Sequence, residues 1–313
     1  MDRAFVFPGQ GSQFVAMGKE IYENFPAGKQ VFQEVDNALN ENLTKLIFEG
    51  PIEDLTQTRN TQPALMAVSL AIVKAIESET KQPLNKLCKY VAGHSLGEYS
   101  ALCAANAISI SDTAKLLRIR GNAMTEAVPT GKGSMAALIG VEFEQAEQIA
   151  KTASPEGNCQ AANDNGGGQV VVSGSVEAID KVIAIAAQFG AKKAVKLPVS
   201  APFHSKFMEP AADIMRQALA ETLINTPTIA VIANVTADIV TNPDEIRDLL
   251  VQQVTGMVRW RESIIRLKQL EVEQIQEIGA GKVLSGLIKR IDKDINSSSI
   301  QNPEDISNFL KNL

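Results

Sequence analysis

The chain has 313 residues, which is long enough for two domains or for one large domain that carries an insertion. Of these residues 45% are hydrophobic and 21% are charged, a composition typical of a globular protein. Its net charge of −6 argues against general affinity for nucleic acid, and no segment approaches the roughly 20 uninterrupted apolar residues that span a bilayer. The start has an acid at position 2 and only a short apolar run before Pro8, unlike a signal peptide, which needs a basic start and a longer apolar core. Three cysteines without CxxC spacing fit reduced thiols, so we expect a cytoplasmic protein.

In chain order, the first predicted element is a buried strand within residues 3–13, where a short apolar run ends at Pro and Gly. Apolar residues at helical spacing predict helices over 17–38 and 62–79. Residues 87–95 predict a second buried strand, and residues 96–107 carry helix formers directly after it. A strand, a tight turn and a helix therefore follow one another in this part of the chain.

The pattern changes between Pro129 and Pro198, where the predicted order is β-α-β-β-α-β, a ferredoxin-like unit. The six predicted elements are strand 133–140, helix 142–153, strand 158–163, strand 169–174, helix 176–190 and strand 191–199. Turn-rich segments flank this unit, and alternating helices and apolar strands resume after it, which indicates an insertion in a larger domain with a parallel sheet. We therefore expect one domain formed by residues 1–128 and 199–313, and an inserted subdomain over 129–198.

The stretch Gly93-x-Ser95-x-Gly97, between the second strand and its helix, has the pattern of a nucleophile elbow. A serine on such a sharp turn has strained backbone angles, so the flanking positions must lack bulk. The turn lifts the hydroxyl above the sheet edge, and the amide of Leu96 at the start of the helix can point at an oxyanion. The alternative is a glycine-rich turn with an idle serine, but the strand and helix on either side favour a nucleophile.

A serine hydroxyl needs a base to act as a nucleophile, and the only imidazoles are His94 and His204. His94 is next to Ser95, and neighbouring side chains on a strand point to opposite faces, so we expect a packing role for it. His204, just past the insertion, remains by elimination as the base, provided that Ser95 is the nucleophile. Arg118 and Arg120 lie on a helical run, and each is either a solvated surface charge or a planar fork for a substrate carboxylate.

Two glycine loops approach nucleotide-binding fingerprints without meeting them. After the first strand, Gly9-x-Gly11 is followed by Phe14 at the position where GxGxxG needs its third glycine. Around "IGAGKVLSG" (278–286), Gln276 stands five positions before Gly281, where a phosphate loop needs its first glycine, and Val283 stands where it needs Ser or Thr. Neither loop therefore predicts a nucleotide site.

Six motifs in order along the chain resemble the malonyl-CoA:acyl carrier protein transacylases of bacterial fatty acid synthesis. They are "FVFPGQGSQ" at the start, "GHSLGEYSAL" at the elbow, "RG-x-x-M-x-EAVP" at 120–129, "GQVVVSG" in the insertion, "APFHS" at 201–205 and "EIGAGKVLSGLIKR" near the end. The resemblance covers essentially the whole chain. It implies an α/β fold, with an α/β-hydrolase-like large domain containing a mainly parallel sheet and an inserted ferredoxin-like (βαββαβ) subdomain. It also implies a Ser–His pair whose imidazole is held by main-chain carbonyls, where a hydrolase would have a Ser–Asp/Glu–His triad.

Position by position, this resemblance implies roles for particular residues. Ser95 matches the nucleophile that accepts the acyl group, and His204 matches the general acid/base. Arg120 matches the arginine that binds the malonyl carboxylate. The two residues whose amides form the oxyanion hole are matched by Gln10 and Leu96.

Three further pocket residues follow from the same resemblance. Gln253 matches a glutamine near the histidine and the arginine, although "QQVTGMVRW" departs from the more usual asparagine-proline form of that segment. Asn165 matches a pocket-facing asparagine, followed here by Gly-Gly in place of a more usual Ser-Pro. Phe203 resembles the malonyl-selective form of related acyltransferases, because a bulky ring there would crowd an α-methyl branch.

The implied reaction transfers malonyl from malonyl-CoA to the phosphopantetheine thiol of an acyl carrier protein by a ping-pong route, without a metal or redox cofactor. The implied partners are malonyl-CoA or CoA and the acyl carrier protein, with no nucleic acid and no membrane, and we expect a monomer. Carrier proteins are acidic, so docking on this acidic chain would need local basic groups. The candidates are Lys192, Lys193, Lys196, Arg259, Arg261 and Arg266. The alternatives are a serine esterase or thioesterase, which should show an acidic triad member, and a non-catalytic acyl- or nucleotide-binding module.

Overall fold

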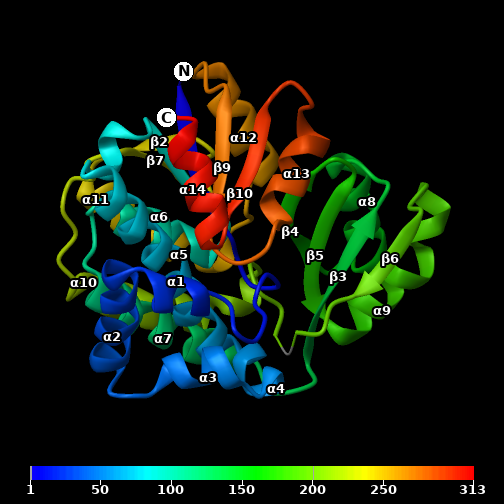
Figure 1. The fold of residues 1–313 in the computed structure, drawn as a ribbon. Helices are drawn as coiled ribbons and strands as arrows, with labels where there is room; N and C mark the ends of the chain where they lie inside the picture. The colour runs from blue at the N-terminus through cyan, green and yellow to red at the C-terminus, as the bar shows by residue number, and fades with distance from the viewer. Residues whose placement is uncertain (1, 200) are drawn as a thin grey trace.

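The computed structural model describes residues 2–199 and 201–313, and their strands form two sheets with helices around them (Figure 1). The strands of the larger sheet are β1 (Arg3–Phe7), β2 (Tyr90–Gly93), β7 (Ala230–Ile232), β8 (Ile239–Val240), β9 (Gln274–Ile278) and β10 (Asn296–Ile300). Their order is β10-β9-β1-β2-β7-β8, and every neighbouring pair is parallel except β7 with β8. The predicted α/β class with a mainly parallel sheet is confirmed.

Strand β1 shows why this sheet is buried on both faces. Successive side chains of a strand point to opposite faces. Ala4 and Val6 pack in one apolar cluster with helices α12 (Trp260–Gln269) and α13 (Val283–Ile291). Phe5 and Phe7 pack in the other cluster, which contains helix α5 (Thr58–Thr80). Because both faces are covered, β1 is a continuous apolar run rather than an alternating one.

The carboxyl ends of β1 and β2 meet at one edge of the larger sheet. The two strands are parallel, with Phe7 paired to Gly93, and the amide of His94 donates to the Phe7 carbonyl at 3.0 Å. The loop that begins at Pro8 therefore lies beside the turn that contains Ser95. In parallel α/β sheets this edge is where ligands bind.

The remaining helices include one place where a single predicted helix is divided in two. They are α1 (Lys19–Asn24), α2 (Pro26–Leu39), α3 (Leu43–Glu49), α4 (Ile52–Thr56), α6 (Leu96–Ala104), α7 (Ile110–Glu126), α8 (Phe143–Ala153), α9 (Val176–Ile185), α10 (Glu209–Ala220), α11 (Pro243–Thr255) and α14 (Pro303–Lys311), with 3-10 helices at Leu84–Lys86, Ala186–Phe189 and Lys206–Met208. The single helix predicted over 17–38 is two helices, because Phe25 is extended at φ −125° before Pro26, and a residue before proline disfavours the helical region. Across the described ranges, no helix combines the length and apolarity that a membrane crossing requires.

The smaller sheet is antiparallel, with the strands β3 (Gly133–Ile139), β4 (Cys159–Gly166), β5 (Gln169–Ser175) and β6 (Lys193–Lys196) in the order β4-β5-β3-β6. Together with α8 and α9 these elements follow the predicted ferredoxin-like order. The predicted lengths differ by more than one residue at an end in three places, one of which is the last strand, predicted over 191–199 and present as β6 only over Lys193–Lys196. Strand β4 runs three residues beyond Asn163, because irregularities near Asn163 and Gly166 keep the segment paired to β5. The predicted helix 176–190 ends as α9 at Ile185 and continues as a 3-10 helix.

Strand β4 is also joined to the larger part of the molecule. The amide of Asp164 donates to the Val258 carbonyl at 3.0 Å, and the amide of Val258 donates to the Ala162 carbonyl at 2.8 Å. The buried carboxylate of Asp164 accepts from Arg261 Nε on α12 at 2.7 Å. These contacts fix the end of β4 close to the edge of the larger sheet where β1 and β2 end.

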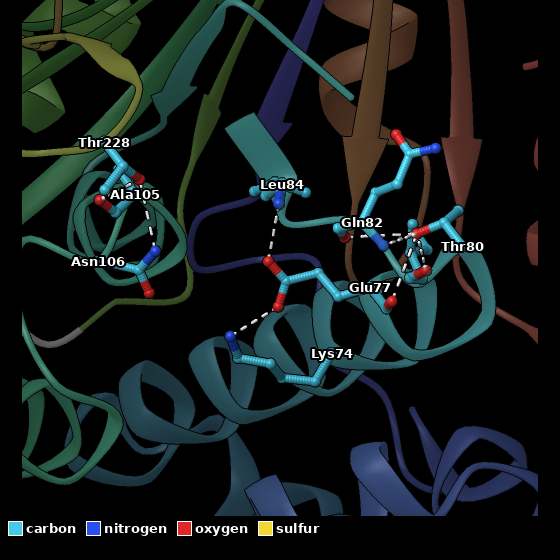
Figure 2. Close-up of polar contacts among 9 residues, drawn as sticks. Lys74, Glu77, Thr80, Gln82, Leu84, Ala105, Asn106 and Thr228 are labelled. Atoms are coloured by element: carbon cyan, nitrogen blue, oxygen red, sulfur yellow. Dashed lines mark hydrogen bonds and ion pairs between the residues drawn. The ribbon is translucent and has the colours of Figure 1, made fainter. Parts of the chain in front are cut away.

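The distal end of α5 is fixed to the segment that leads into β2 (Figure 2). Glu77 accepts from Lys74 Nζ at 2.7 Å and from the amide of Leu84 at 2.8 Å. After α6, the amide of Thr228 donates to the carbonyl of Ala105 at 2.8 Å, which ties this turn to the segment before β7 (Figure 2). Helices α5 and α6, which both contribute residues to the site described next, are thereby held at their carboxyl ends.

Candidate active site

Ser95 occupies a strained turn between β2 and α6. Its φ is 54° and its ψ is −110°, a conformation that L-residues rarely adopt. A Cβ on Gly93 would lie 1.9 Å from the main chain of Gly97, and a Cβ on Gly97 would lie 2.2 Å from the carbonyl oxygen of Phe7. The predicted need for residues without bulk on both sides of the serine is thus met by backbone packing.

Asn234, directly after β7, holds this turn from the neighbouring strand. Its Oδ1 accepts from the amide of Ser95 at 2.8 Å, and its Nδ2 donates to the Gly93 carbonyl at 2.7 Å. Asn234 is absent from the site residues predicted from the sequence. A polar side chain after the apolar run "TIAVIA" was the available signal, because parallel strands end at a common edge.

The structure brings Ser95 and His204 together, although 109 residues separate them in the chain. Ser95 Oγ lies 2.8 Å from His204 Nε2. His204 Nδ1 faces the main-chain carbonyls of Gln253 at 2.9 Å and Gly256 at 3.1 Å. Since Nδ1–H donates to these carbonyls, Nε2 carries the lone pair that can accept the serine proton. Two carbonyls therefore hold the ring where a hydrolase triad would place a carboxylate.

The environment of His204 keeps its ring neutral. Burial lowers the pKa of His204 to about 3, and the positive charge of Arg120 acts in the same direction. The hydrogen bonds from Nδ1 to the carbonyls of Gln253 and Gly256 oppose this shift without cancelling it. Near neutral pH the imidazole is in the form that accepts a proton.

Of the two arginines on α7, only Arg120 reaches the site. Its side chain is 1% exposed, and Nη1 donates to Gln62 Oε1 at 2.8 Å. Nη2 donates to Ser95 Oγ at 3.1 Å and to Gln253 Oε1 at 2.9 Å. Arg118 instead pairs with Glu41 at 2.5 Å. The buried guanidinium of Arg120 also lies over the ring of Tyr99, with Cζ 5.5 Å from the ring centroid.

Gln253 is fully buried and lies behind Ser95 and Arg120. Its Nε2 donates to the Ser95 carbonyl at 2.9 Å and to Glu98 Oε2 at 2.7 Å. The amide of Asn234 also donates to Glu98 Oε2, at 3.1 Å. Glu98 and Gln62 were both missed by the sequence analysis, since buried polar residues on apolar helices carry no periodic signal.

His94 makes a separate contact, as its position next to Ser95 predicts. Its Nε2 lies 2.8 Å from Asn165 Oδ1, and its ring lies 5.6 Å from that of Trp260. Burial lowers the pKa of His94, while the contact with Asn165 opposes the shift. Asn165 thus lies in the site through β4, next to the histidine that is not paired with the serine.

These groups surround a cavity of about 260 Å³ at the junction of the two sheets. It is lined by seven of the eight predicted site residues, namely Gln10, Ser95, Leu96, Arg120, Asn165, Phe203 and His204. Apolar side chains such as Met135 and Val171 complete the wall. Within residues 2–199 and 201–313, there is no group of three or more His, Cys, Asp or Glu side chains that could hold a metal ion.

Most of the basic residues considered for carrier docking already have acidic partners. Lys196 pairs with Asp180 at 2.7 Å, Arg261 with Asp164 at 2.7 Å and Arg266 with Asp238 at 2.8 Å. Arg259, the residue before α12, is bonded to Glu262 in the first turn of that helix. Such pairs reduce the net positive charge that these residues present to an acidic partner.

The chain matches the acyl transferase domain over residues 4–290. It is 43% identical to the malonyl CoA-acyl carrier protein transacylase of Bacillus subtilis, over 99% of this chain and 96% of that protein. It is 40% identical to the enzyme of the same name from Escherichia coli K12, over 98% of both.

Solved structures agree with these relatives. The acyl-carrier-protein S-malonyltransferase of Bartonella henselae superposes with a TM-score of 0.97 at 53% identity, covering 99% of both chains. A malonyl-transacylase solved in complex with its type II PKS acyl-carrier protein has a TM-score of 0.96 at 37% identity, covering 100% of both chains.

Proposed function

The chain belongs to the acyl transferase domain family, among the malonyl CoA-acyl carrier protein transacylases, and from this we propose that it loads malonyl from malonyl-CoA onto Ser95 and passes it to the phosphopantetheine thiol of an acyl carrier protein. The observation that carries the assignment of residues is the 2.8 Å contact of Ser95 Oγ with His204 Nε2, beside the guanidinium of Arg120.

The first half of the reaction forms a malonyl ester on Ser95. His204 Nε2 takes the hydroxyl proton as Ser95 Oγ attacks the thioester carbonyl of malonyl-CoA. The carbon–sulfur bond then breaks, and the proton moves from His204 to the departing CoA thiolate. The main-chain carbonyls of Gln253 and Gly256 orient the ring and stabilise its protonated form, a role that a carboxylate has in hydrolases.

The negative charge of the tetrahedral intermediate needs donors placed in advance. We assign this role to the amides of Gln10 and Leu96, which come from the two adjacent loops at the carboxyl ends of β1 and β2. Leu96 is the first residue of α6, where the helix dipole also favours an anion. One such donor typically contributes about a hundredfold or more in rate.

In the second half, the carrier thiol replaces CoA. His204 removes the proton of the phosphopantetheine thiol, whose sulfur attacks the malonyl ester, and the same proton returns to Ser95 Oγ when the ester bond breaks. The two half-reactions are each other's mechanistic reverse, so the same groups serve both. No step in this scheme requires a bound cofactor.

Arg120 is the group we assign to substrate selection. A guanidinium matches a carboxylate bidentately, and burial strengthens the interaction. Arg120 lines the cavity and contacts Ser95 Oγ, which supports this role, because an acyl group carried by Ser95 would lie beside the guanidinium. Phe203, in the cavity wall next to His204, is proposed to disfavour an α-methyl branch and thus methylmalonyl.

The main alternative is a serine esterase or thioesterase, which would use water in place of the carrier thiol. The carbonyl-bound imidazole favours transfer over this alternative, since a hydrolase of this kind carries a carboxylate on the ring. A structure of a relative with its acyl-carrier protein supports a carrier as the second substrate. We also propose a cytoplasmic monomer.

One experiment distinguishes transfer to a carrier from hydrolysis. The protein is incubated with malonyl-CoA alone, and free CoA and malonate are measured before and after a holo carrier protein is added. Transfer predicts at most one equivalent of CoA at first, and malonyl-carrier after the addition. Continuous release of malonate without carrier would contradict the proposal, and Ser95→Ala should abolish both signals.

A further inference from the structure

Glu98 is a buried carboxylate beside the site that the reaction scheme does not use. It lies in the first turn of α6, three residues after Ser95, and is 2% exposed. Burial of a carboxylate is costly unless hydrogen bonds compensate for the lost hydration. Its contacts therefore deserve a physical explanation.

A helix cap would be the simple explanation, but the structure does not use Glu98 in this way. A serine followed three residues later by glutamate has the spacing of a capping box, in which the glutamate accepts from the serine amide. Here the Ser95 amide donates to Asn234 Oδ1, and no side-chain cap forms at this helix. The Glu98 carboxylate instead accepts from Gln253 Nε2 at 2.7 Å and from the Asn234 amide at 3.1 Å.

These contacts determine which way the Gln253 amide points. Glu98 Oε2 accepts from the Asn234 main-chain amide, so it is an acceptor whether or not the carboxyl group is protonated, and the Ser95 carbonyl can only accept. Together these two oxygens take both hydrogens of Gln253 Nε2. Oε1 then faces Arg120 Nη2 at 2.9 Å. A reversed amide would place Oε1 against two acceptors and its NH₂ group against the guanidinium.

We propose that Glu98 is a positioning residue for substrate selection: it orients the Gln253 amide, which in turn orients the Arg120 guanidinium toward a substrate carboxylate. The inference rests on the proposed function, because the orientation of Arg120 matters only if the acyl group carries an acid. Glu98 itself touches neither substrate nor reacting atoms.

A purely structural role would have a different signature. Glu98 also accepts from the amide of Asn234, the residue whose side chain holds the turn at Ser95. Damage to the elbow would slow every acyl donor equally. Loss of the Gln253 orientation would slow malonyl-CoA and spare acetyl-CoA, because acetyl has no carboxylate for Arg120.

The test compares kcat/KM for malonyl-CoA and acetyl-CoA, with the same holo carrier protein, in matched variants. Glu98→Met fills the space without an acceptor, whereas Glu98→Gln keeps an acceptor oxygen. The control is Glu77→Met, which removes the hydrogen bonds to Lys74 and Leu84 (Figure 2). Glu77 lies 15 residues along α5 from Gln62, about 22 Å at the helical rise.

We expect Glu98→Met to lower the malonyl-to-acetyl ratio about tenfold, the effect of losing one hydrogen bond to a charged group. Glu98→Gln and the control Glu77→Met should keep the wild-type ratio. Gln253→Leu should reproduce the loss, and the double variant should lose no more than either single variant, since both act through one contact. An unchanged ratio in Glu98→Met, or additive losses in the double variant, would overturn the proposal.

Two further outcomes are decided in advance. If thermal unfolding shows that Glu98→Met does not fold, Glu98→Ala decides, because it also removes the acceptor: a fall of about tenfold in its malonyl-to-acetyl ratio supports the proposal, and an unchanged ratio overturns it. If the wild-type protein itself fails to prefer malonyl-CoA over acetyl-CoA, the proposed function of Arg120 fails, which is distinct from failure of the role of Glu98.

Discussion

Replacement of Glu98 by Gln should change the stability of the protein in a way that depends on pH. Burial raises the pKa of Glu98 from 4.5 to about 7, opposed by hydrogen bonds from Gln253 and Asn234 and by the charge of Arg120. The folded protein thus holds this proton more tightly than the unfolded chain. The free energy of unfolding therefore falls as pH rises from 4.5 to about 7, by about 1.4 kcal/mol per pH unit. Above pH 7 the full loss is about 3 kcal/mol.

Urea unfolding of the wild-type protein and of Glu98→Gln, near pH 5.5 and near pH 8, measures this contribution of Glu98 to the free energy of unfolding. Glutamine cannot ionise, so the variant does not lose this stability as pH rises. Its free energy of unfolding, relative to that of the wild-type protein, should be about 2 kcal/mol higher at pH 8 than at pH 5.5. Other titrating groups, His94 and His204 included, are present in both proteins and cancel in the comparison. A difference that stays constant or shrinks with rising pH would refute the conclusion that burial dominates at Glu98.

Three other changes follow from the same structure. Arg120→Ala should lower kcat/KM for malonyl-CoA about a hundredfold more than for acetyl-CoA, as a lost bidentate contact to a carboxylate predicts, and equal losses would contradict its role. Burial lowers the pKa of His204 to about 3, so the rate of Ser95 acylation in rapid-quench experiments should stay within about twofold between pH 7 and pH 5. A histidine with its ordinary pKa would lose about 25-fold over the same range, and such a loss would contradict the assignment. Gly97→Ala places a Cβ 2.2 Å from the Phe7 carbonyl oxygen and should cost about 3 kcal/mol or more in urea unfolding, so a wild-type midpoint would show that the turn is not tightly packed.

The order of strands and helices was predictable because local patterns encode it. Apolar runs ended by glycine and proline mark the buried strands β1 and β2, and helical spacing marks α5 and both helices of the insertion. Where a predicted helix or strand had the wrong bounds, the cause was a feature that apolar spacing does not show. Pro26 divides the first helical segment, and irregular pairing extends β4 past Asn163. The boundaries of the inserted subdomain at 129 and 198 stay predictions.

The site was predictable only in part. The elbow glycines identify Ser95, elimination leaves His204, and resemblance supplies Arg120 and Gln253. Polar residues that support these groups, such as Asn234, do not lie at any characteristic distance from the serine along the sequence. They come from neighbouring strands and helices that only folding brings together. Asn234 acts through hydrogen bonds to the main chain of Ser95 and Gly93, and the sequence signals only that a polar residue follows an apolar run.

The most direct test of the account is the mass of the intact protein after brief exposure to malonyl-CoA without a carrier, followed by identification of the modified peptide. The account predicts one malonyl group, on Ser95, removed by later addition of holo carrier protein and absent in Ser95→Ala. A malonyl group on another residue, or an unmodified protein that still transfers malonyl, would contradict it.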